Sequence, residues 1–142
     1  MLVLIPVLDS VNALPAVRYV IREYLRERPE VLLLHLRSRL AHLEPARELL
    51  ERFRIRHSVE RGTGNKFEAI AAVARRARPD FVVLGTARYG SVTRMSEESV
   101  IHKLLDGCPA PLVVVAGKDV SPLERYGIAA GLGATLGLIL LA

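Results

Sequence analysis

Residues 81–117 read FVVLGTARYGSVTRMSEESVIHKLLDGCPAPLVVVAG, and this stretch decides the fold. Two short apolar runs, at 81–84 and 112–115, have the length and composition of strands that are buried on both faces. Between them lie a polar loop containing glycine and a segment, beginning near Ser96, with apolar residues at helical spacing. Gly107 and the two prolines that follow it end this helix. The pattern predicts a strand, a loop, a helix and a strand, which form a right-handed βαβ unit.

The composition is that of one globular domain with an aliphatic core. The chain has 142 residues, of which 51% are hydrophobic and only 5% aromatic. Lys and Arg total 20 against 15 acids, a formal net charge of +5. Because no compact basic block with interleaved aromatic residues occurs, we expect a solvated basic surface and no nucleic-acid partner.

Cysteine usage and the first residues indicate the compartment. Cys108 is the one cysteine, which excludes an intramolecular disulfide and suits a reducing environment. The first ten residues, MLVLIPVLDS, lack the basic region and cleavage site of a signal peptide. We therefore expect a cytoplasmic protein.

The same alternation of strands and helices occupies the first 80 residues. Apolar runs predict strands at 2–7, 31–36 and 55–59, the third nearer a sheet edge because its apolar residues alternate with polar ones. Helical spacing predicts helices at 11–28, 45–53 and 66–78, with Asn65 as the cap of the last. Five strands and four helices in alternation predict an α/β fold, a doubly wound five-stranded parallel sheet with helices on both faces.

The last segment has a different character. Residues Gly127 to Ala142 carry no charge and are apolar all round. We therefore divide the chain into a domain at 1–118 and a linker with an apolar tail at 119–142, and we predict a C-terminal helix in the tail. A helix of this length spans roughly 24 Å, short of the roughly 30 Å bilayer core. Three interpretations stay open: packing on this subunit or a partner helix, membrane association, and disorder.

Three segments together resemble the universal stress protein family. They are LIPVLDS near the amino end, VLLLHL at 31–36, and LGTARYGSVTRMSEESVIHKL followed by CPAPLVVV. The resemblance covers nearly all of residues 1–118. It implies a Rossmann-like α/β fold, a role in the stress response, and ATP binding in some members only. It also implies a homodimer paired through the last strand, Leu112 to Val115, which we expect to be an exposed edge.

The nucleotide motif of that family is Gly, two residues, Gly, nine residues, then Gly-Ser or Gly-Thr. Gly85 fits the first position and Ser99 the last, whereas Arg88 and Glu98 stand in place of the second and third glycines. By position, the resemblance implies nucleotide contacts from the following residues: Val7, Asp9, Leu36, Gly85, Arg88, Gly90, Ser91, Ser99 and Val100.

Three of these residues have a second interpretation. Asp9 is displaced by one position from the family's acid, so it is either a ribose or metal contact or a helix cap, and we favour the cap. Leu36 is either an adenine contact or a core residue, and we favour the core. Ser99 either binds phosphate or lies in the first turn of a helix.

The replaced glycines predict a changed site. Glycines after a strand let backbone N–H groups approach phosphate oxygens, and a helix amino end adds partial positive charge. Arg88 obstructs one close approach but brings a guanidinium that can pair with phosphate. Glu97 and Glu98 place two carboxylates beside the phosphates. We therefore predict a vestigial or altered nucleotide site, with ATP binding as the alternative.

No catalytic group can be argued from the spacing of the reactive residues. Nothing indicates a Ser/His/Asp or Cys/His arrangement or a cluster with metal-ligand spacing, so we expect no catalytic residue, no metal and no enzyme activity. We interpret His35, at the end of an apolar strand, as a core or pocket-edge histidine. The sequence thus predicts a non-enzymatic, dimeric stress-response module. The alternatives are an ATP-binding switch with slow hydrolysis and a membrane-associated scaffold.

Overall fold

One parallel sheet organises the chain, in a computed structural model that describes residues 1–7, 10–36, 40–85, 101–116 and 136–140. In chain order the elements are β1 (Leu2–Val7), α1 (Ser10–Tyr24), the 3-10 turn η1 (Leu25–Glu27), β2 (Glu30–His35), η2 (Leu40–Leu43), α2 (Glu44–Arg52), β3 (Arg56–Arg61), α3 (Lys66–Ala77), β4 (Phe81–Gly85), helical residues 101–107, β5 (Leu112–Ala116) and β6 (Leu136–Leu140). The strands lie in the order β3-β2-β1-β4-β5-β6, and every pair is parallel. The predicted parallel sheet is confirmed, with β3 at an edge.

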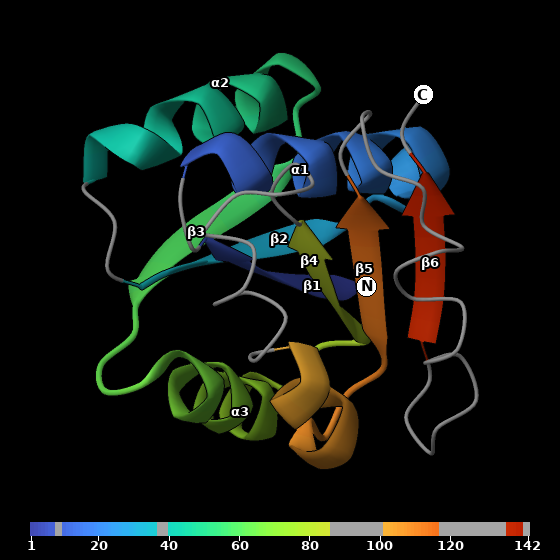
Figure 1. Cartoon of the computed structure of the whole chain (residues 1–142). Coiled ribbons are helices and arrows are strands. Elements are labelled where there is room, and N and C mark those ends of the chain that lie inside the picture. Colours follow the sequence, from blue (N-terminus) through green and yellow to red (C-terminus); the bar gives the residue numbers. More distant parts are fainter. Residues whose placement is uncertain (8–9, 37–39, 86–100, 117–135, 141–142) are drawn as a thin grey trace.

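Helices cover both faces of the sheet, as the apolar strands require. Figure 1 shows α1 and α2 on one face, and α3 with helical residues 101–107 on the other. Successive strand residues alternate between the two layers: Val3 and Ile5 pack on the α1 side, whereas Leu4 lies in the cluster on the α3 side. Strands buried on both faces are expected to be apolar at every position, and β1 is.

Two local predictions are also confirmed. The side chain of Asn65 caps α3, because its Oδ1 accepts a hydrogen bond from the backbone N–H of Glu68 at 2.8 Å. In helical residues 101–107, the predicted apolar stripe of Ile101, Leu104 and Leu105 is buried.

The C-terminal tail departs from the prediction. Leu136–Leu140 form a strand parallel to β5 instead of a helix. An apolar stretch with no helical periodicity has no preferred face, and here its backbone groups pair with the outer edge of β5. The other residues that follow β5, 117–135 and 141–142, lie outside the described residues. Over the part of the chain that the structure describes, no helix is long and apolar enough to cross a membrane.

The new strand also changes the expected dimer contact. Residues Leu112 to Val115, predicted to be an exposed edge, are all in register with β6. The side chains of Leu112 and Val114 are fully buried as well. The prediction of a free edge is therefore wrong. Dimerisation through this strand stays a prediction, and it requires β6 to move aside.

Candidate functional site

The carboxyl ends of the central strands form the candidate site. From β1 the sheet extends through β2 and β3 on one side and through β4 on the other, so the winding reverses between β1 and β4. These two strands are in register at Val3↔Phe81 and Leu4↔Val82, and among the described residues no register pair joins their carboxyl halves. Open α/β sheets bind ligands in the crevice at such a switch point.

Three of the predicted contact residues lie at this edge. Val7 ends β1 and Gly85 ends β4, and both are buried. Leu36 directly follows β2 and is 5% exposed. The side chains of Val7 and Leu36 belong to opposite layers, because Val7 packs in the α1 cluster and Leu36 in the α3 cluster. Leu36 is therefore buried in the core on the α3 side, and its contact with adenine stays a prediction.

The remaining predicted contacts lie outside the described residues. They are Asp9, Arg88, Gly90, Ser91, Ser99 and Val100.

Gly62 is a residue of this edge that the sequence analysis did not single out. Its N–H donates a hydrogen bond to the carbonyl oxygen of His35 at 2.8 Å. A Cβ at Gly62 would lie 2.6 Å from Cδ2 of Leu36 and 3.1 Å from Cβ of Ala69. Any other residue at this position would therefore force the side chain of Leu36 to shift. The available signal was the Gly-Thr-Gly-Asn sequence that begins three residues after the predicted strand at 55–59.

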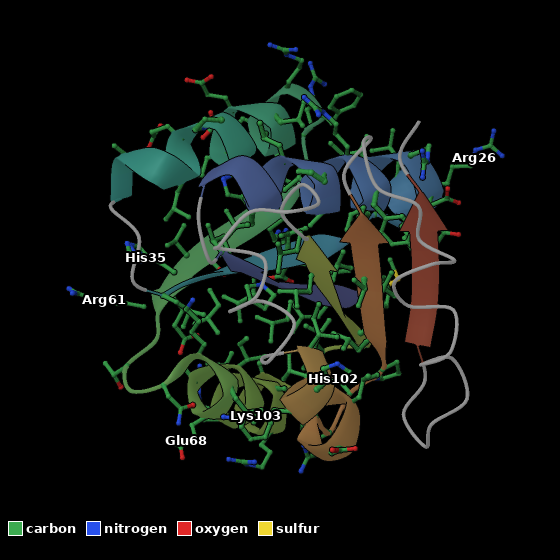
Figure 2. The ribbon with its side chains drawn as sticks, in the orientation of Figure 1. Arg26, His35, Arg61, Glu68, His102 and Lys103 are labelled. Atoms are coloured by element: carbon green, nitrogen blue, oxygen red, sulfur yellow. The ribbon has the colours of Figure 1, made fainter. Side chains whose placement is uncertain are left out.

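His35 is buried at the end of β2, as expected for a core or pocket-edge histidine. Its Nδ1 lies 3.1 Å from the carbonyl oxygen of Leu36. A carbonyl can only accept, so Nδ1 carries the proton and donates it. Across the sheet, His35 is in register with Val7 on one side and with Arg61 on the other. Figure 2 shows His35 and Arg61 at the same edge, with the Arg61 side chain directed outward.

The described part of the edge offers apolar walls, a closely packed backbone loop and positive charge. The charge comes from the exposed guanidinium of Arg61 and from the amino end of α3, which adds roughly half a unit and also carries the exposed carboxylate of Glu68 in its first turn. This combination suits an anionic ligand with an apolar part. Among the described residues, no group of three or more His, Cys, Asp or Glu side chains could hold a metal ion.

A comparison with models of protein families shows which family the chain belongs to. The profile described as the universal stress protein family matches residues 36–116, which is more than half of the 142 residues. The chain belongs to the universal stress protein family. The match includes Gly62, Gly85 and the loop that carries the universal stress protein motif. No curated protein sequence matches the chain.

Solved structures of other universal stress proteins share the fold. A universal stress protein family protein from Arabidopsis thaliana, with AMP bound, has a TM-score of 0.65 and 17% identity over 82% of this chain and 90% of its own. A universal stress protein in complex with cAMP has a TM-score of 0.65 and 14% identity over 82% of this chain and 96% of its own. Both likenesses confirm the doubly wound architecture.

Proposed function

We propose that this universal stress protein is a non-enzymatic regulatory module of the stress response, with a nucleotide site altered so that it does not hold ATP tightly. One observation carries the proposal. Gly85 ends β4 next to the switch point between β1 and β4, so the motif loop starts at the carboxyl ends of the strands, where sheets of this kind bind ligands. In that loop Arg88 and Glu98 replace two glycines of the family motif.

The charges of the altered loop argue against a bound triphosphate. At about 4 Å and an effective dielectric constant near 20, one pair of like charges costs on the order of 4 kcal/mol. A charge-assisted hydrogen bond from Arg88 returns roughly 1.5–3 kcal/mol. Glu97 and Glu98 contribute two carboxylates, so repulsion of the phosphates exceeds the gain from Arg88.

The same reasoning favours nucleotides with less charge. The two solved structures contain AMP and cAMP, which each have a single phosphate. A single phosphate brings less negative charge beside the two glutamates than a triphosphate does. We therefore propose that any nucleotide at this site is an adenine mononucleotide, and that AMP binds at least as tightly as ATP.

Isothermal titration calorimetry with AMP, cAMP and Mg-ATP tests the proposal. We expect the unmodified chain to bind Mg-ATP no more tightly than AMP. Glu98→Gln removes one carboxylate and keeps the shape of the side chain, so it should strengthen Mg-ATP binding by at least about tenfold, or 1.4 kcal/mol. Glu48→Gln, which makes the same charge change at an exposed position of α2, should leave the affinity unchanged.

Low-micromolar binding of Mg-ATP by the unmodified chain would contradict this account. It would favour an ATP-binding switch, and slow release of phosphate would then show whether the switch hydrolyses its ligand.

A further inference from the structure

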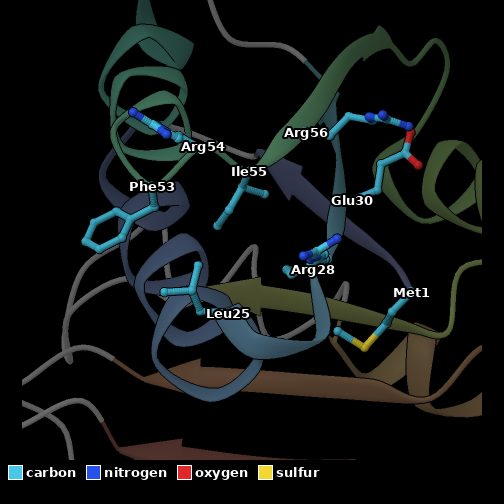
Figure 3. Close-up of a pocket in the computed structure, with 9 residues that line it drawn as sticks. Met1, Leu25, Arg28, Glu30, Phe53, Arg54, Ile55 and Arg56 are labelled. Atoms are coloured by element: carbon cyan, nitrogen blue, oxygen red, sulfur yellow. The ribbon is translucent and has the colours of Figure 1, made fainter.

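A pocket lies at the end of the sheet opposite to the candidate nucleotide site, where β2 and β3 begin. It has a volume of about 500 Å³ and lies between the end of η1 and the end of α2. Figure 3 shows Leu25 and Phe53 on one wall and Ile55 beside them. Leu25 and Phe53 are each 41% exposed, whereas Ile55 is 5% exposed. The pocket therefore has a buried apolar floor and a wall of exposed large apolar side chains.

The charged lining of this pocket is mainly positive. Arg28, Arg54 and Arg56 line it, with Glu30 as the acid among the lining residues. Glu30 is in register with Arg56 on the neighbouring strand, and Figure 3 shows the two side chains extending toward each other. The ion pairs of the described residues, which join Arg22 to Glu23, Arg47 to Glu44 and Arg76 to Glu60, involve no arginine of the pocket. Within the described residues, no ion pair therefore balances the charges of Arg28 and Arg54.

Both of these arginines have a backbone conformation that disfavours them. Arg28 has φ 50° and Arg54 has φ 55°, in the left-handed region where glycine is preferred. Each follows the end of a helix and precedes a strand. An arginine at such a position costs stability relative to glycine, and outliers of this kind are often retained where the side chain has a function.

We propose that this pocket docks an acidic peptide segment of a partner protein, with one large apolar side chain against Leu25, Phe53 and Ile55 and its carboxylates over Arg28 and Arg54. The sign of the charge selects an acidic ligand. The half-exposed wall selects an extended segment, because pockets for small molecules usually bury about 70–90% of the ligand surface. The nucleotide site takes no part, since it lies at the other end of the sheet.

The probe is a fluorescein-labelled peptide of four glutamates around two central leucines, followed by fluorescence anisotropy at low ionic strength. We expect saturable binding that weakens as salt is added. Arg28→Gly with Arg54→Gly should raise the dissociation constant at least about tenfold. The melting temperature of this double variant should be no lower than that of the unmodified chain, because glycine relieves both left-handed positions. Phe53→Ser should abolish binding without unfolding the chain, because Phe53 is exposed.

The controls separate docking from general attraction. Arg75→Glu, a charge reversal at an exposed position of α3, should leave the affinity unchanged. A peptide with lysines in place of the glutamates should not bind.

Four results would overturn the proposal. One is no binding of the acidic peptide, and a second is an equal loss of affinity in Arg75→Glu. The third is a double variant that has a lower melting temperature but binds the peptide as tightly as the unmodified chain. This result would mean that the two arginines only stabilise the ends of the helices that precede them. The fourth is occupation by something else, shown by self-association or binding to anionic vesicles that the double variant abolishes.

Discussion

Gly62 shows how a single missing side chain shapes the nucleotide edge. The loop after β3 packs on Leu36 because no Cβ separates them, and a Cβ there would lie 2.6 Å from the Leu36 side chain. The same residue holds the end of β2 through its hydrogen bond to the carbonyl of His35. Its position therefore links the core on the α3 side to the edge that we assign to the ligand.

Gly62→Ala should destabilise the fold by about 1–3 kcal/mol, because an extra methyl group overpacks this site. Leu36→Ala alone should cost about 2–5 kcal/mol through the cavity that it leaves. The double variant should lose less than the sum of the two, since the shortened side chain makes room for the methyl group. Urea unfolding of the unmodified chain, the two single variants and the double variant measures the coupling energy. If the two losses of stability are strictly additive, an alanine methyl group at Gly62 does not clash with the side chain of Leu36.

The turns from helix to strand share one feature at the scale of the elements. α1 with η1, α2 and α3 are each followed by an arginine with positive φ, namely Arg28, Arg54 and Arg78. Glycine is the usual residue at such a position. Each turn thus loses some stability and presents a cation at the amino edge of the sheet.

Arg78 does not line the peptide pocket, so a substitution there tests the energetic cost of the positive φ angle alone. Arg78→Gly should raise the free energy of unfolding by about 0.5–1 kcal/mol, because the residue has φ 51° and ψ 57°. Arg75→Gly, three residues earlier inside α3, should lower it by about 1 kcal/mol. Urea denaturation compares the two variants. A loss of stability in both would mean that the Arg78 side chain stabilises the end of the helix by more than its backbone costs.

The elements differ in how far their sequences predict them. The extent of β1 follows from its sequence because Leu2 to Val7 form an unbroken apolar run. β3 is displaced from the prediction, since the edge strand Arg56–Arg61 is mostly exposed and carries little apolar signal. The helix predicted for the tail is wrong at 136–140, where the chain forms a strand. Apolar residues with glycines indicate burial but do not distinguish a helix from a strand. The positions of Val7, Leu36 and Gly85 at the carboxyl ends of their strands could be predicted from the family motif. The role of Gly62 could not, because it depends on a contact with Leu36 that only the folded chain shows.

At the scale of the whole molecule, β6 is the outermost strand on one side of the sheet and pairs with β5. It therefore covers the strand edge through which the family resemblance implies a dimer. An unpaired strand edge is a template for pairing with another chain. Because β5 pairs with β6 along its length, self-association through β5 depends on whether β6 is in place.

A variant that ends at residue 118 should therefore associate more strongly than the full chain. Leu138→Pro with Ile139→Pro should act in the same direction, because successive N–H groups of a strand point to opposite sides and one of these two therefore faces β5. Sedimentation velocity at matched concentrations should give a larger sedimentation coefficient for both variants, with unchanged circular dichroism in the helical bands. Equal sedimentation of all three chains would remove β5 as a dimer contact. Flotation of the full chain, but not of the shortened one, with vesicles would instead support attachment of the tail to membranes.

The most direct test of the altered nucleotide site is the nucleotide content of the freshly purified chain. The protein is denatured, and the ultraviolet absorbance of the released small molecules is measured after their separation by ion-exchange chromatography. We predict no stoichiometric ATP, because Glu97 and Glu98 repel its phosphates. One ATP released per chain would contradict the central claim.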